Sequence, residues 1–128
     1  MPLAGIRRPH QEPYIVTVGS NHKTIMINLE GQMQWEVQTP KDPKIILSDP
    51  FGNVVLSHSA EFEIWDKYHD NFRELYTYLE DWCFVKAVSF DGKEIFKWKA
   101  PAPLSGVLAI GKKGEVYCVS DGQLWAIG

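Results

Sequence analysis

Short runs of apolar and β-branched residues, separated by turn-forming residues, make up most of the chain. Two segments, TIMINLEGQMQWEVQTP from Thr24 and FVKAVSFDGKEIFKWKAP from Phe84, each contain two such runs around an acidic residue followed by glycine. This dipeptide is a strong hairpin signal because glycine tolerates the positive φ that a tight turn requires. The pattern predicts an all-β chain built from hairpins.

Residues 59–82 break this pattern, because their apolar residues recur every three or four positions, as on one stripe of a helix. Ser59 is placed as an N-cap, with acidic residues in the first turn. The segment therefore predicts one long amphipathic helix, whose apolar stripe consists of Phe62, Trp65, Tyr68, Phe72, Leu75, Tyr76, Leu79 and Trp82.

The strands recur in three similar units, which begin near Pro2, Pro43 and Pro103. The first spacing is 41 residues and the second is 60, so the second unit is longer by 19, which is about the length of the predicted helix. Removing it leaves units of about 40 residues with four strands each, the size of a propeller blade. We therefore expect one domain over 1–128, divided into units 2–40, 43–101 and 103–128. A helix of about 60–81 is inserted between the second and third strands of the middle unit, and the last unit is incomplete.

The segments GEVYCVSDGQLWAIG and INLEGQMQW resemble the quinoprotein-type β-propeller repeat, in which a strand, a turn and a second strand lead to a Gly-x-x-x-Trp corner. The resemblance covers most of the chain outside residues 59–82. It implies a propeller-like array of about three four-stranded blades, the last one incomplete, with one inserted helix. Ordinary propellers have 4–8 blades, so no quinone cofactor and no catalytic residue is carried over. A β-sandwich of the same strands is the alternative fold.

The net charge of −3 is concentrated in the predicted insertion, since residues 61–82 carry seven acids and two bases, a net −5, and the rest of the chain carries +2. On a helix, the carboxylates cluster opposite the apolar stripe, with Tyr78 among them. Insertions on repeat scaffolds often carry function, although a merely solvated acidic face remains the alternative. The candidate partner-binding residues are Glu63, Asp66, Asp70, Glu74, Tyr78 and Asp81.

Catalytic, metal-binding and cofactor-binding patterns are missing from the sequence. The four histidines have no metal-ligand spacing, and the GKKG stretch at 111–114 fits a turn better than a phosphate loop. Cys83 and Cys118 lie in apolar runs and are expected to be reduced core thiols. We see no basic patch for nucleic acid, no membrane span and no secretory signal, so we expect a cytoplasmic protein.

These features predict a non-enzymatic protein-binding module. In its narrowest form it is an immunity protein, whose acidic helical face neutralises a cognate toxin, for instance by filling the basic cleft of a nuclease. The alternatives are an assembly subunit that completes a propeller by strand pairing, and a small-ligand-binding propeller fragment. A homodimer is a further expectation, because three units and three units fall within the blade counts that close a ring.

Overall fold

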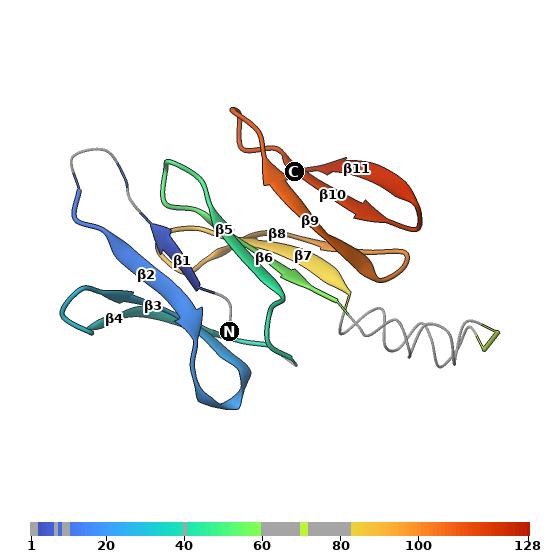
Figure 1. The fold of residues 1–128 in the computed structure, drawn as a ribbon. Helices are drawn as coiled ribbons and strands as arrows, with labels where there is room; N and C mark the ends of the chain where they lie inside the picture. Colours follow the sequence, from blue (N-terminus) through green and yellow to red (C-terminus); the bar gives the residue numbers. More distant parts are fainter. Residues whose placement is uncertain (1–2, 7, 9–10, 40, 60–69, 72–82) are drawn as a thin grey trace.

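The computed structural model describes residues 3–6, 8, 11–39, 41–59, 70–71 and 83–128 (Figure 1). These residues form three antiparallel sheets of four, four and three strands, so the prediction of an all-β chain is confirmed. Among them, helical geometry is confined to one 3-10 turn, η1 (Ser20–His22).

Each sheet is a meander in which strands pair in chain order. The first sheet contains β1 (Leu3–Ile6), β2 (Tyr14–Val18), β3 (Lys23–Asn28) and β4 (Met33–Gln38). The second contains β5 (Ile45–Ser48), β6 (Val54–His58), β7 (Phe84–Val88) and β8 (Glu94–Lys99). The third contains β9 (Leu104–Ile110), β10 (Val116–Ser120) and β11 (Gln123–Ile127).

The β3–β4 and β7–β8 hairpins have the turns that the sequence predicts. Gly31 and Gly92 have φ values of +84° and +88°, which L-residues with a side chain adopt only at a cost. The Asn28 side-chain oxygen accepts backbone N–H groups two and four residues later, at 3.1 and 2.8 Å. Both ladders also shift register at a bulge, before Ile27 in the first sheet and before Val88 in the second. The two sheets thus repeat one local geometry.

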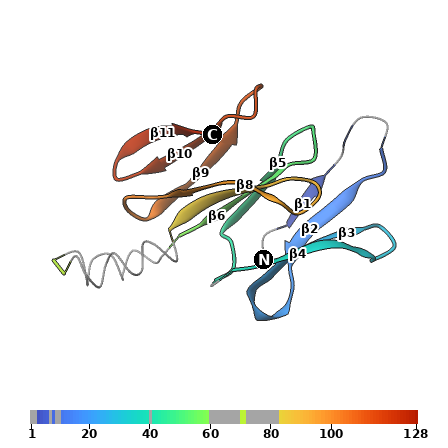
Figure 2. The same ribbon diagram turned by 180° about the vertical axis from the view of Figure 1, so that it is seen from behind.

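The sheets pack face to face in chain order, and their first strands β1, β5 and β9 lie next to one another (Figures 1 and 2). One buried cluster joins the first sheet to the second, and another joins the second to the third. Strand β6 is buried along its whole length because Val54 and Leu56 face the first cluster and Val55 faces the second. The middle sheet is therefore covered on both faces, which explains its almost continuous apolar strands.

The aromatic residue four positions after each hairpin glycine packs against the following sheet. A Cβ built on Gly92 would lie 2.9 Å from the Cβ of Trp35, so only glycine lets the indole approach this closely. Phe96 makes the equivalent approach one sheet later, where its ring would lie 3.4 Å from a Cβ on Gly128. The Gly-x-x-x-aromatic spacing is thus part of the packing between sheets.

Residues 59–83 connect β6 to β7, the second and third strands of the second sheet. Most of this connection lies outside the described residues, including the predicted helix of about 60–81. Among the described residues, Asp70 lies in a turn and Asn71 has no regular secondary structure, so the prediction of one unbroken helix across 59–82 is wrong at these residues. The physical reason is local, because Asp-Asn favours turns through side-chain hydrogen bonds to nearby backbone.

Both cysteines are buried thiols outside any disulfide, as predicted, and both belong to the cluster between the second and third sheets. Burial raises the pKa of the Cys118 thiol above its ordinary value, which keeps the sulfur protonated and unreactive. In the described part of the chain, no helix has the length and apolar character needed to cross a membrane.

Candidate functional site

The β6–β7 connection is held at both ends by paired strands. His58 at the end of β6 lies opposite Phe84 at the start of β7, and both side chains are buried. The corresponding connections in the other sheets are short: η1 joins β2 to β3, and Asp121-Gly122 joins β10 to β11. A tight turn has therefore been replaced by about 25 residues on a fixed base.

The predicted partner-binding residues all belong to this connection. Asp70 is exposed in its turn, and the other five, Glu63, Asp66, Glu74, Tyr78 and Asp81, lie outside the described residues. Asp70 lies in a turn, so the prediction that these residues belong to one unbroken helix does not hold at Asp70. These residues share a segment of net negative charge that lies between two fixed strand ends.

A stacked histidine forms the base of this site. The His58 ring lies on the Phe84 ring with centroids 4.3 Å apart and planes inclined by 20°. The imidazole is fully buried, and neither ring nitrogen has a hydrogen-bond partner of good geometry within the described residues. Burial, and then the charge of Lys86, lower the pKa of His58 to about 4. His58 is therefore neutral near pH 7 and packs as an aromatic side chain.

Lysines on β7 and β8 place positive charge near the stacked His58–Phe84 pair. Lys86 and Lys97 lie directly opposite each other in the ladder. The Lys97 ammonium lies 4.4 Å from the centroid of the Phe84 ring, a cation–π contact, and Lys86 forms an ion pair of 3.6 Å with Glu94. Like charges placed opposite each other destabilise a sheet slightly. The two lysines lie close to the start of β7, where a segment with a net charge of −5 ends.

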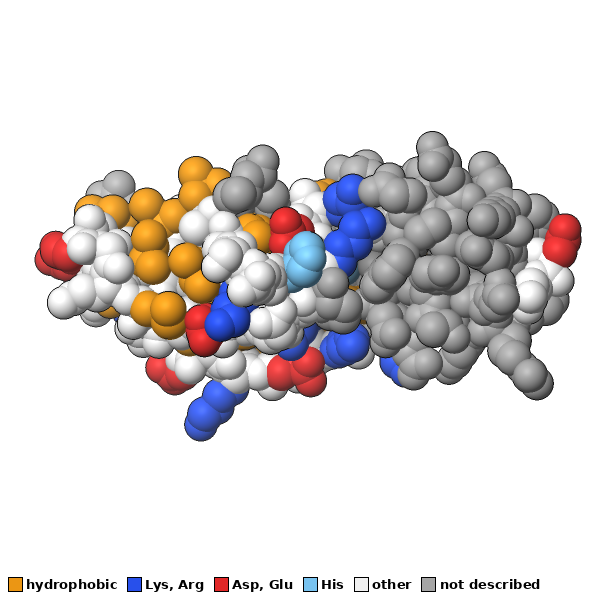
Figure 3. Space-filling model, turned by 90° about the horizontal axis from the view of Figure 1, so that it is seen from below, with side chains coloured by type: hydrophobic (Ala, Val, Ile, Leu, Met, Phe, Trp, Pro, Cys, Tyr) orange, Lys and Arg blue, Asp and Glu red, His pale blue; other side chains and the backbone are white. Residues whose placement is uncertain are grey.

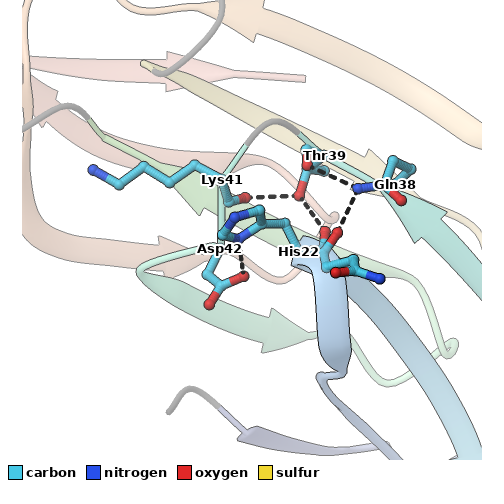
Figure 4. A network of polar contacts seen from close by, with 6 residues as sticks. His22, Gln38, Thr39, Lys41 and Asp42 are labelled. Carbon is cyan, nitrogen blue, oxygen red and sulfur yellow. Dashed lines mark hydrogen bonds and ion pairs between the residues drawn. The ribbon is translucent and has the colours of Figure 1, made fainter.

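A polar network beside this base ties η1 to the segment that leads into β5 (Figure 4). His22 Nδ1 lies 2.8 Å from a carboxylate oxygen of Asp42, and the Gln38 amide donates to the Asn21 carbonyl at 2.6 Å. The buried Thr39 hydroxyl lies 3.0 Å from the His22 carbonyl and 2.7 Å from the Lys41 carbonyl, and it donates to one of them at a time.

This network stabilises the backbone of η1. Asn21 and His22 both have positive φ, and the bonds from Gln38 and Thr39 hold that unfavourable backbone in place. The His22–Asp42 pair is about half-exposed, so it contributes about 1 kcal/mol or less. The network lies next to the strand ends that carry residues 59–83, and it holds the neighbouring backbone in a fixed conformation.

A groove of about 410 Å³ lies between the second and third sheets, at the ends of the β5–β6 and β9–β10 turns. Its polar side chains are Asp49, Asn53 and Lys113. The Asp49 carboxylate already accepts N–H groups from Phe51 and Asn53, each at 2.9 Å, and so closes its own turn. The lining residues that the structure describes are therefore mostly apolar and include no paired nucleophile and general base.

The described residues contain no group of three metal-ligating side chains. Ser59 lies next to His58 in the chain, but its hydroxyl accepts the backbone N–H of Leu104 at 3.0 Å and so joins the second sheet to β9. The Ser59 hydroxyl is thus engaged in a contact between two sheets. The residues that it would cap as predicted lie outside the described part of the chain.

The buried pair of His58 and Phe84 was not predicted from the sequence, because the histidines were considered there only as metal ligands. A signal was present in the strand FVKAV, where Lys86 interrupts an otherwise apolar run. A charged residue within a strand that is apolar on both sides indicates a local need for that charge.

Comparison with known proteins does not assign the chain to a family: no family model matches it, and no curated protein sequence matches it significantly.

Proposed function

We propose that this chain is a non-enzymatic protein-binding module in which the segment 61–82 binds a basic surface on another protein. One observation carries the proposal: a segment with a net charge of −5 replaces a tight turn between two paired strands whose ends, His58 and Phe84, are buried. A rigid base reduces the freedom that the segment loses on binding, and so favours affinity.

The scaffold in this proposal is a stack of propeller-type blades. Support comes from the order of the sheets, from the neighbouring positions of β1, β5 and β9, and from the packing of Trp35 on Gly92 and of Phe96 on Gly128. Each of these relations repeats from one sheet to the next, as expected of a repeat protein in which every unit contacts only its neighbours.

The narrower form of the proposal is a toxin inhibitor. A carboxylate-rich segment is complementary to the basic cleft in which a nuclease holds phosphates, and opposite charges accelerate diffusional encounter. Since the charge outside residues 61–82 sums to +2, the attraction would depend on this segment and not on the whole surface.

A matched pair of charge reversals tests the proposal. In the segment variant Glu63, Asp66 and Glu74 become lysine; in the scaffold variant the exposed Glu12, Glu30 and Asp91 become lysine, so both change the net charge equally. Each protein serves as bait for the product of the neighbouring gene and for proteins captured from its native host. We expect the segment variant to bind the captured partner at least about 100-fold more weakly at low ionic strength, and the scaffold variant to bind within a few-fold of the unmodified protein.

Both variants should keep the β-sheet circular dichroism and melting temperature of the parent. The reversed scaffold residues are exposed charges, which contribute little to folding, and the reversed segment residues lie in a connection outside the strands of the three sheets. If the segment variant and the parent bind equally, the acidic segment takes no part in binding and is only a solvated surface. If the captured partner is a toxin, the parent protein should also protect against it, and the segment variant should not.

A further inference from the structure

The first sheet has an outer face, turned away from the second sheet, that is rich in apolar residues. The register places Ile15 opposite Ile27 and Ile27 opposite Met33, and opposed residues in a sheet share a face. Leu3 lies on the same face, opposite Thr17. Leu3 is 65% exposed and Met33 is 58% exposed, and hydrophobic side chains gather at this end of the molecule in Figure 3.

The residues of the second sheet that occupy the equivalent positions are buried. Ile15 pairs with Ile27, which follows the bulge of β3; Val54 pairs with Val88, which follows the equivalent bulge of β7. Val54 and Val88 are completely buried because the first sheet covers them. By the same register Leu3 corresponds to Ile46, which is only 5% exposed. The outer face of the first sheet thus carries apolar residues at the positions that pack against a neighbouring sheet elsewhere in the chain.

The third sheet has the complementary outer face. Tyr117 lies opposite Ala126, and Val119 lies opposite Leu124. Cys118, between them on β10, faces the second sheet, so the side chains of Tyr117 and Val119 point the other way. Leu124 is 71% exposed.

The corresponding face is buried in the first sheet. There Val16 pairs with Met26 and Val18 with Thr24, and all four are buried where this sheet meets the second. By position, Leu124 corresponds to Thr24 of β3 and to Val85 of β7, each completely buried. The outer face of the third sheet is therefore of the kind that packs onto a following sheet.

We propose that a second copy of this chain covers these faces, with the outer face of the third sheet of each copy packed on the outer face of the first sheet of the other. The contact continues the packing that the chain already uses twice internally. Two such contacts, related by a twofold axis, close an assembly of six sheets, which lies within the 4–8 blades of closed propellers. This inference rests on the register of the sheets and is independent of partner binding by residues 61–82.

Three acidic substitutions on the full chain test the arrangement. Leu3→Glu places a charge on the face of the first sheet, and Leu124→Glu places one on the face of the third. Phe51→Glu is the matched control, because Phe51 is 69% exposed on the β5–β6 turn of the middle sheet. All three change an exposed apolar side chain to glutamate, so circular dichroism should show the same fold in each. Molar mass is measured by light scattering during size exclusion and by sedimentation across a concentration series.

The unmodified protein and the control should have twice the chain mass of 14.6 kDa. Leu3→Glu and Leu124→Glu should each weaken self-association at least about 100-fold, since an unpaired charge is costly in an apolar contact. An equimolar mixture of the two should recover a 1:1 dimer, because one unmodified pair of faces remains between them. An unmodified protein that stays monomeric at all concentrations overturns the proposal. So does a dimer that only one of the two substitutions weakens, because head-to-tail packing needs both faces.

Discussion

Replacing His58 with phenylalanine should remove a specific dependence of folding stability on pH. The imidazole is fully buried, stacks on Phe84, and has no hydrogen bond of good geometry within the described residues. Phenylalanine keeps the stacking and leaves no polar atom without a partner. At pH 7 the free energy of unfolding of the variant should therefore lie within about 1.5 kcal/mol of the parent value.

The magnitude follows from the pKa of His58, which burial and neighbouring lysines lower from 6.5 to about 4. The unfolded chain then binds a proton more readily than the folded one. The stability that the folded protein has with a neutral His58 is therefore complete above the pKa of histidine in the unfolded chain, and it is lost as the pH falls towards the pKa of His58 in the folded protein. Each unit of pKa difference corresponds to 1.36 kcal/mol, so the full effect is about 3 kcal/mol, and most of it is lost between pH 7 and pH 4.5.

Urea unfolding followed by tryptophan fluorescence, at pH values from 4.5 to 7, measures this effect. The difference in unfolding free energy between the parent and His58→Phe should change by about 2.5 kcal/mol across the series, in favour of the variant at low pH. Val85→Ala is the control, because it removes core volume without a titrating group and should give a curve parallel to the parent. Parallel curves for the parent and His58→Phe would refute a neutral, buried histidine at the base of the insertion.

Two further predictions concern the packing between sheets and the insertion. Gly92→Ala should cost about 1–3 kcal/mol more in unfolding free energy than Gly31→Ala: both positions have positive φ, but only at Gly92 does an added Cβ meet Trp35. Equal costs in chemical denaturation would show that the indole adapts freely. Replacing residues 60–81 with a two-residue Asn-Gly turn should leave a folded, mainly β protein, and loss of the β signal in circular dichroism would mean that the insertion is part of the core.

Hairpins were predictable from the sequence because their information is local. Glu30-Gly31 and Asp91-Gly92 identified the two turns. The spacing from each glycine to Trp35 or Phe96 was visible in the sequence, but only the structure shows that these aromatic residues pack on the following sheet. The long connection between the second and third strands of the second sheet was predictable from repeat length together with the change of periodicity at residues 59–82.

The burial of His58 could not be predicted in the same way. Histidine has no strong preference for the core. Its pKa is lowered first by burial and then by the charges of Lys86 and Lys97, which lie more than 25 residues away in the chain and come near it only through the pairing of β6, β7 and β8. The turn at Asp70 was missed because the apolar periodicity of residues 62–82 continues through it, and Asp-Asn gave the weaker signal.

Salt dependence of the association rate is the most direct test of the claim that residues 61–82 bind a basic protein partner. The rate constant of the captured partner is measured by stopped flow between about 0.02 and 0.5 M ionic strength, where the screening length falls several-fold. We predict a steep decrease for the unmodified protein and for the scaffold variant with Glu12, Glu30 and Asp91 reversed, and a nearly flat dependence for the segment variant with Glu63, Asp66 and Glu74 reversed. Equal slopes for all three proteins would contradict the claim.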